Sequence, residues 1–390
     1  MRFALLANPE NRRASFFAAA CGRLGLPAPA VISWDSFLSG GPETLAATLR
    51  GCDALRIESP GENWQVERRL IALGAEACAA EGIHPSIAAG EAIGLPEDRG
   101  RVRFGRQWYH GWCAALERVG EAMAATGIPA MNPPEAIALM FDKAAAQAHL
   151  AATGVPIPRP LGTPSGFDNL LAMMASARVS RLFLKPCHGS SGAGVVAFQR
   201  HANDGRMLAI CPAEIVRDGA GARLYNSLRV TRFTTAADLR ALIDAVCAER
   251  AHAEAWFPKA GFRGRAFDLR VVVIGGEARH CVARTSAGPI TNLHLGNARG
   301  DLDAICRRMG DEAWHEARRV CQLAARAFPR CAYAAIDLLV GTDFASFAVA
   351  EVNAFGDLLP GIQSQGQDTY TAALAAWIDS PEPNKPPPAR

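Results

Sequence analysis

Hydrophobic and polar positions alternate in blocks near the start of the chain, and these blocks predict strands and helices in turn. Short apolar runs at 3–7, 30–34 and 54–58 have the length and composition of buried strands. The segments between them carry apolar residues at helical spacing. Strands that alternate with helices are typical of a parallel sheet covered by helices. We therefore predict an α/β domain over residues 1–130, ending at the proline-rich segment 127–134.

The remainder of the chain has a different pattern, in which strand-like runs follow one another or are separated by single helices. Several runs are close enough in sequence to pair as antiparallel hairpins. The last residues, 380–390, are rich in proline and predict a disordered tail. The predicted strands are 181–185, 195–198, 266–274 and 278–285, and the predicted helices are 141–152, 170–177, 236–250, 312–327 and 368–377.

A hairpin predicted over residues 334–353 carries polar residues inside two apolar runs. If the hairpin is centred on Phe344, Asp337 lies opposite Glu351. Asn353 then shares the face of Glu351, because side chains alternate along a strand. Facing carboxylates repel each other, so we expect a positive group between them, and hard oxygen ligands suit Mg²⁺. The alternative is that this face of the hairpin is simply exposed to solvent.

A glycine-rich loop follows the strand that ends at Lys185 and precedes another strand. Because it joins strand to strand, this glycine loop (residues 189–194) is neither a Rossmann turn nor a P-loop. Its backbone N–H groups can still bind phosphate from a flexible flap. Cys187 and His188 lie beside it, and we assign them a packing or loop role. The candidate binding residues of the loop are Gly189, Ser190, Ser191, Gly192 and Gly194.

The composition and charge of the chain indicate the general class of protein to which it belongs. Hydrophobic residues make up 49% and charged residues 20% of the 390 residues, with a net charge of +3. This balance predicts a globular protein and gives no support for nucleic-acid or membrane partners. The eleven cysteines include no C-x-x-C pair, which predicts buried, reduced thiols and a cytoplasmic protein. We find no signal peptide and no apolar run long enough to span a membrane, and whether the protein forms a homo-oligomer is left open.

Several charged and amide residues lie on or beside the predicted strands. Cations neutralise phosphate oxygens, carboxylates bind Mg²⁺, and amides orient a substrate. Each residue alone has an ordinary explanation as a solvated side chain, and their joint occurrence points to a nucleotide-triphosphate site. The set is Lys143, Lys185, Arg270, Arg284, Asn292, Asp337, Glu351 and Asn353.

The order of these motifs resembles that of ATP-grasp proteins, in particular bacterial glutathione synthetase and the RimK-type amino-acid ligases. The resemblance covers about residues 131–378. It implies an α/β (α+β) chain in which a two-subdomain ATP-grasp fold, 131–252 and 253–379, follows the N-terminal domain. The motifs that carry it are Asp142-Lys143, Leu184-Lys185-Pro186 with the glycine loop, Asp268 to Gly276, Ala283-Arg284, Thr291-Asn292-Leu293, Asn297 to Asp301, Ile336-Asp337-Leu338 and Glu351-Val352-Asn353.

The resemblance also implies a role for each residue. Lys143 and Lys185 would hold the α- and β-phosphates of ATP, the glycine loop would close over the triphosphate, and Glu254 would lie at the adenine site. Arg284, with Arg270, would stabilise the transferring phosphoryl group, and Asn292 would line the same site. Two Mg²⁺ ions, or Mn²⁺ in their place, would bind Asp337, Glu351 and Asn353.

These roles imply an ATP-dependent ligase that activates a carboxylate as an acyl-phosphate and joins it to an amine or a thiol. The substrates would be a small-molecule or peptide carboxylate and an amine acceptor. Two alternatives are a kinase on the same scaffold and a protein that binds ATP without turnover. The segment 353–361 departs from the pattern of the resembled ligases, so the substrate does not carry over. Asn8, Arg56 and Glu58 follow or end predicted strands, where they either bind substrate or stabilise turns.

Overall fold

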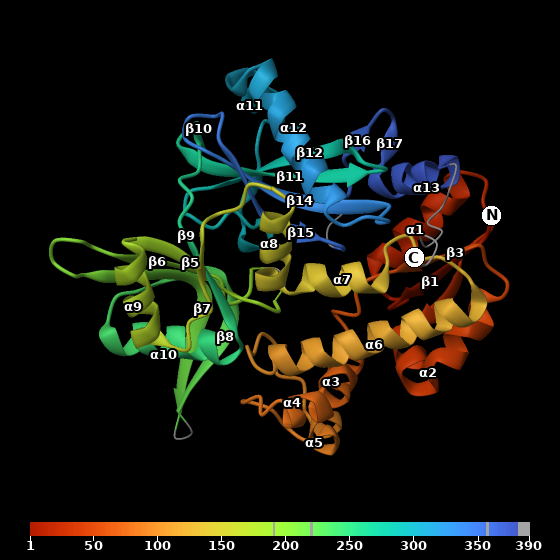
Figure 1. Ribbon diagram of the computed structural model, residues 1–390, viewed down its shortest axis with the longest axis horizontal. Helices are drawn as coiled ribbons and strands as arrows, with labels where there is room; N and C mark the ends of the chain where they lie inside the picture. Colours follow the sequence, from red (N-terminus) through yellow and green to blue (C-terminus); the bar gives the residue numbers. More distant parts are fainter. Residues whose placement is uncertain (190–191, 219–220, 356–358, 381–390) are drawn as a thin grey trace.

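The structure, a computed structural model, describes residues 1–189, 192–218, 221–355 and 359–380 (Figure 1). It has three parts, which Figure 1 separates by colour: an N-terminal part in red and orange, a central part in green, and a C-terminal part in blue-green and blue. Ser190, Ser191 and the predicted tail beyond Ser380 lie outside the described residues. No helix in the described ranges is long and apolar enough to cross a membrane.

The N-terminal part confirms the predicted alternation of strands and helices. Its three strands form a parallel sheet in the order β2-β1-β3. The strands are β1 (Phe3–Ala7), β2 (Ala30–Ser33) and β3 (Ala54–Ile57). The helices are α1 (Arg12–Arg23), α2 (Trp34–Leu49), α3 (Trp64–Leu73), α4 (Ala75–Ala80), α5 (Ala89–Gly94) and α6 (Gly105–Thr126).

Helices α3 and α6 cross at unusually close range because glycine occupies the contact on both. A Cβ added to Gly74 would lie 2.0 Å from the carbonyl oxygen of Gln107, and one added to Gly111 would lie 1.8 Å from that of Leu70. Real Cβ atoms do not approach so closely, so only glycine permits this packing. Gly74 also separates α3 from α4.

The central part is a six-stranded antiparallel sheet in the order β4-β9-β5-β6-β7-β8, with α9 and α10 packed on it (Figure 1). The long β7–β8 hairpin has no counterpart among the predicted strands, because Pro212 interrupts it and its outer half is exposed instead of alternating between core and solvent. The elements are β4 (Pro160–Gly162), α9 (Phe167–Ala177), β5 (Arg181–Pro186), β6 (Val196–Arg200), β7 (Met207–Asp218), β8 (Gly221–Phe233), α10 (Ala236–Ala248) and β9 (Ala251–Ala255).

The C-terminal part is built on the sheet β13-β12-β11-β14-β15, which contains the predicted hairpin. The register places Asp337 opposite Glu351 and Ala335 opposite Asn353, which confirms the predicted pairing. The elements are β10 (Gly261–Phe262), β11 (Arg265–Ile274), β12 (Glu277–Ser286), η1 (Leu293–Leu295), β13 (Ala298–Arg299), α11 (Leu302–Met309), α12 (Asp311–Arg326), β14 (Tyr333–Val340), β15 (Phe347–Asn353), β16 (Gln363–Ser364), β17 (Gln367–Asp368) and α13 (Thr369–Asp379).

Between the N-terminal and central parts, the helix predicted at 141–152 is present with its start two residues later, and a separate helix precedes it. α7 (Pro134–Phe141) ends at Asp142, and α8 (Lys143–Ala152) begins after it. Asp142 has extended backbone angles, and its side chain caps α8 by accepting a hydrogen bond from the N–H of Ala145. The predicted start lay two residues too early because Asp142, a strong N-cap residue, begins a new helix instead of continuing α7.

The hydrophobic core is shared unevenly between the three parts. One cluster joins Leu6 and Trp112 of the N-terminal part to Ile336 of the C-terminal part, and a second joins Phe3 to Trp377. The central part has its own cluster around Phe198. The N-terminal and C-terminal parts are therefore packed as one body, against which the central part is set.

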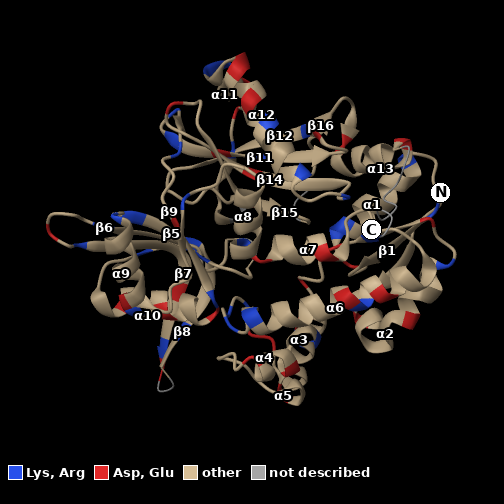
Figure 2. Ribbon diagram, in the orientation of Figure 1, with Lys and Arg blue, Asp and Glu red and all other residues tan. Residues whose placement is uncertain are grey.

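The eleven cysteines form no disulfide, and seven of them are buried. Figure 2 shows both signs of charge on every part of the molecule, as the nearly balanced sequence predicts.

Candidate functional site

The predicted metal ligand Asp337 is buried on β14 and is held by two arginines from neighbouring strands. Arg270 of β11 lies directly opposite it and donates from Nε and Nη2 to the two carboxylate oxygens at 2.7 and 2.8 Å. Arg284 of β12 donates from Nη1 at 3.1 Å. Burial alone would raise the pKa of the Asp337 carboxyl, but the two guanidiniums outweigh it and hold that pKa well below its usual range. The positive charge expected beside Asp337 is thus supplied in this structure by the chain itself.

A second buried carboxylate, Asp268, continues this network along β11. It accepts a hydrogen bond from Arg284 Nε at 2.7 Å and one from the hydroxyl of Thr291. Lys259 lies 3.7 Å from Asp268 and donates to Thr291 at 3.0 Å. Burial lowers the pKa of the Lys259 ammonium, although Asp268 opposes that shift. Lys259 did not appear among the predicted residues because it precedes β10 in a loop with no motif around it.

Lys143 lies between the glycine loop and the hairpin. Its ammonium donates to the carbonyl oxygen of Gly189 at 2.5 Å and lies 3.0 Å from the Glu351 carboxylate. Further along the glycine loop, a Cβ added to Gly192 would lie 3.0 Å from Asn292 Nδ2, so the loop also approaches this candidate residue. The structure therefore brings together three elements that the sequence placed far apart: the start of α8, the glycine loop and β15.

Lys185 and Glu254 form a further cation–carboxylate pair of the site, at 2.5 Å between β5 and β9. Glu254 also accepts a hydrogen bond from Gln147 Nε2 at 2.8 Å, and Gln147 Oε1 lies 3.0 Å from His252 Nε2. Burial lowers the pKa of His252. Sequence reasoning missed Gln147, because a single glutamine in an alanine-rich helix carries no signal for a contact with a strand more than 100 residues away.

The Asp142 carboxylate joins the base of the glycine loop to the N-terminal part. It accepts hydrogen bonds from Arg250 Nη1 and, at 3.3 Å, from His188 Nε2. The His188 ring stacks on Tyr109 of α6, with centroids 3.9 Å apart and planes within 6°. Burial lowers the pKa of His188, while Asp142 opposes the shift. The loop role predicted for His188 therefore includes a contact that crosses between parts.

A neighbouring carboxylate, Glu249, caps helix α6 from the central part. Its oxygens accept hydrogen bonds from the backbone N–H groups of Phe104 at 2.8 Å and Gly105 at 2.7 Å. These are among the donors that a helix start leaves without an intrahelical partner. Burial raises the pKa of the Glu249 carboxyl, and the backbone donors oppose the shift.

Arg56 is fully buried. Its guanidinium carbon lies 4.9, 4.6 and 4.8 Å from the ring centroids of Phe17, Tyr333 and Tyr370, and its Nε donates to Glu58 at 2.7 Å. Among the described residues, Nη1 and Nη2 have no hydrogen-bond partner. Asn8 is also buried and donates to the carbonyls that follow β3. Arg56 thereby joins the N-terminal part to Tyr333 of β14 and Tyr370 of α13.

The hairpin residues fit Mg²⁺ in chemistry but do not make a complete ligand shell. Asp337 and Glu351 offer carboxylate oxygens, which Mg²⁺ prefers. The Asn353 amide donates to the Ala335 carbonyl at 3.4 Å, which leaves its own oxygen available. Within the described ranges, no group of three or more His, Cys, Asp and Glu could hold a metal. Phosphate oxygens would have to complete the shell.

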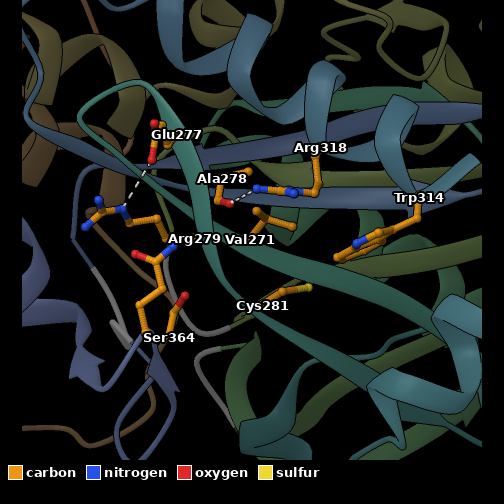
Figure 3. A pocket seen from close by; sticks show the side chains of 9 residues that line it. Val271, Glu277, Ala278, Arg279, Cys281, Trp314, Arg318 and Ser364 are labelled. Atoms are coloured by element: carbon orange, nitrogen blue, oxygen red, sulfur yellow. Dashed lines mark hydrogen bonds and ion pairs between the residues drawn. The ribbon is translucent and has the colours of Figure 1, made fainter. Parts of the chain in front are cut away.

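A separate cavity of about 290 Å³ is lined by residues of β11, β12 and α12 (Figure 3). Val271, Cys281 and Trp314 provide its apolar wall, and Arg318 donates to the carbonyl of Ala278 at its edge. None of the predicted site residues lines this cavity.

Two antiparallel sheets, one in the central part and one in the C-terminal part, give the chain a fold that solved ATP-grasp structures share. Neither a family model nor a curated protein sequence matches the chain. Three solved structures show the same fold. D-cycloserine synthetase DcsG superposes with a TM-score of 0.54 at 15% identity, covering 96% of this chain and 99% of that chain.

The second structure is the ADP complex of purK, an N5-carboxyaminoimidazole ribonucleotide synthetase, with a TM-score of 0.55 and 10% identity over 96% of this chain and 76% of that chain. The third is the ATP-grasp ligase PsnB with a precursor peptide and AMPPNP, with a TM-score of 0.50 and 16% identity over 96% of each chain. Structural similarity at such low sequence identity establishes only the fold of the chain. Its chemistry therefore has to be argued from its own residues.

Proposed function

We propose that the protein is an ATP- and Mg²⁺-dependent ligase that activates a carboxylate and joins it to an amine, or to a thiol. One observation carries this proposal. Lys143 contacts both the carbonyl of Gly189 in the glycine loop and the carboxylate of Glu351 in the hairpin. A cation held between a glycine loop and a carboxylate is suited to bind phosphate and to release the carboxylate to a metal.

The similar structures support the same class of reaction. Their names describe synthetases and a ligase, and two of them were solved with ADP or AMPPNP. If this chain binds nucleotide in the same way, the triphosphate would compete with Glu351 for Lys143 and with Glu254 for Lys185. Glu351, Asp337 and Asn353 would then hold one or two Mg²⁺ ions, which would neutralise charge on the phosphate oxygens.

The reaction would occur in two steps that need no covalent attachment to the enzyme. A substrate carboxylate attacks the γ-phosphorus of ATP and forms an acyl-phosphate, with ADP leaving. An amine then attacks the acyl carbon and displaces phosphate. Arg284 and Arg270 would stabilise the charge on the transferring group, and closure of the glycine loop would exclude water.

Glu351→Gln tests the proposal, because the amide keeps the shape of the side chain but not its charge. We expect wild-type folding, and turnover reduced by about a hundredfold or more, as for loss of a group that stabilises the transition state. Glu277→Gln, at an exposed position of β12, is the matched control. Turnover is measured as ADP release with pooled carboxylic acids, peptides and amines, and product mass is measured in parallel.

The mass of the product distinguishes a ligase from a kinase. A product lighter than its combined substrates by one water supports ligation, and a stable added phosphate shows the kinase instead. Failure of Mg²⁺–AMPPNP to bind wild-type protein in calorimetry would exclude all ATP-dependent functions. Wild-type turnover in Glu351→Gln would contradict the assignment of the hairpin to the metal.

A further inference from the structure

The outer edge of the central sheet contains a strand segment without a partner. β8 is the last strand of the sheet. Its pairing with β7 stops at Asn226, which lies opposite Ala213, and resumes at Thr231, which lies opposite Cys211. The segment Ser227–Val230 therefore has only Pro212 across from it. Proline has no N–H to donate to a ladder, so the segment is released from β7.

This segment is both apolar and basic at the surface. The side chains of Leu228 and Val230 are 73% and 45% exposed, and they are two of the few large hydrophobic side chains exposed in the described ranges. Arg229 lies between them, and Arg232 follows; both are exposed and have no carboxylate partner among the described residues. An exposed apolar edge with unpaired cations is complementary to an extended segment that carries apolar and acidic side chains.

The same edge of β8 already pairs with another segment of the chain just before Ser227. Val102 N donates to the carbonyl of Leu224 at 3.0 Å, and Asn226 N donates to the carbonyl of Gly100 at 2.6 Å, with an antiparallel bridge at Tyr225. Before Gly100 the chain turns away, because Arg101 N donates back to the carbonyl of Asp98. The edge thus remains available where Ser227 begins.

The strand β8, to which this segment belongs, also contacts the candidate site. β8 packs beside the short helix η1, which directly follows Asn292. Asn292 in turn is approached by Gly192 of the glycine loop. A peptide docked on β8 would therefore lie on a strand that contacts an element next to Asn292.

We propose that Ser227–Val230 is a docking strand for a peptide substrate with alternating apolar and acidic side chains, which binds by extending the sheet. The substrate carboxylate of the ligase would then belong to this peptide. The inference rests on the proposed function, since it names the class of its substrate. Main-chain hydrogen bonds would provide affinity, and Leu228, Val230 and Arg229 would provide selectivity.

Fluorescence anisotropy with the full chain tests the docking strand. The probe is a short fluorescein-labelled peptide of alternating valine and glutamate, and lysine replaces glutamate in the control peptide. We expect saturable binding that weakens with added salt, because the Arg229 contribution is electrostatic. We expect Leu228→Asp and Arg229→Glu each to weaken binding by about tenfold, the effect of losing one good contact.

Val216→Asp is the matched control, because Val216 is 42% exposed on β7 of the same hairpin but lies away from the free edge. It should leave binding unchanged. A peptide with alternate N-methyl amides lacks the ladder donors and should not bind. Equal binding of the N-methylated or lysine peptide, no binding of the glutamate peptide, or equal loss with Val216→Asp would each overturn the proposal.

Light scattering distinguishes a second copy of the chain as the occupant. A dimer that dissociates in Leu228→Asp would overturn the peptide proposal. Calorimetry with Mg²⁺–AMPPNP on the same samples separates this inference from the proposed function. Nucleotide binding without peptide binding refutes only the docking strand, whereas peptide binding without nucleotide binding refutes only the ligase.

Discussion

At the scale of single residues, every cation assigned to phosphate binding is already paired with a carboxylate. Lys143 is paired with Glu351, Lys185 with Glu254, and Arg270 with Asp337. A nucleotide would have to exchange these contacts for its own phosphates. The pairs keep partly buried charges satisfied, since an unpaired buried charge is costly.

The residue pairs differ in how far the sequence could predict them. The pairing of Asp337 with Glu351 follows from one short hairpin and alternation along its strands, and it was predicted correctly. The pairing of Asp337 with Arg270 requires β11 to lie beside β14, which local pattern does not determine. Gln147 and Lys259 were missed for the same reason, because their partners are distant in sequence.

We expect Arg56→Ala to destabilise the protein, because the change removes the cation that is paired with Glu58. The change would leave Glu58 buried without its cation and would remove the group packed among three aromatic rings. Loss of one member of a buried pair typically costs about 3–5 kcal/mol. The free energy of unfolding in urea measures the effect.

Two further variants identify the cause. The double variant Arg56→Met, Glu58→Gln removes both charges and should recover a large part of the loss. Arg99→Ala removes an exposed ion pair and should leave stability unchanged. Equal stability of Arg56→Ala and wild type would show that the enclosed cation has no structural role.

At the scale of elements, the break between α7 and α8 determines where Lys143 lies. Asp142 ends one helix, caps the next, and accepts hydrogen bonds from His188 and Arg250. Sequence pattern predicted α8 with its start two residues early and did not predict α7 as a separate helix before it. The start was misplaced because the preference for an N-cap residue is only about 1 kcal/mol.

Asp142→Ala should loosen the base of the glycine loop as well as the helix. We expect a loss of about 3–5 kcal/mol in stability, since a buried charged group is removed, and weaker binding of Mg²⁺–AMPPNP in calorimetry. Asp142→Asn keeps the cap acceptor, so its loss of stability should be smaller. If both variants bind nucleotide with wild-type affinity, Asp142 does not position Lys143.

At the scale of the whole molecule, the two core clusters that join the N-terminal and C-terminal parts contrast with the separate core of the central part. Parts that share little core are expected to move relative to each other. The sequence predicted the order of these parts along the chain. It did not predict which of them share a core, because that depends on the docking of α7, α8 and α13.

Stability should fall as the pH is lowered through the usual range of histidine titration. Burial lowers the folded-state pKa of His188, His252 and His280. In the unfolded chain these residues would take up protons near pH 6.5, so below about that pH the unfolded state binds more protons. The stabilisation present above this pH is therefore lost as the pH falls towards the folded-state pKa values.

Urea unfolding at a series of pH values between neutral and mildly acidic measures this effect. His188→Asn should reduce the slope of unfolding free energy against pH, since one of the three groups is removed. A slope that is flat in the wild-type protein would contradict the shifted pKa values.

The cap that Glu249 places on α6 limits how this chain can be divided or recombined. α6 is the longest helix of the N-terminal part, yet its first N–H groups are satisfied by a carboxylate from the central part. An N-terminal fragment produced alone would begin that helix uncapped. A chimera that exchanges the first domain for that of a protein with the same fold would have to supply both an acceptor at the start of α6 and a matching turn at Glu249. The three parts are therefore not interchangeable modules, even though each has a recognisable fold.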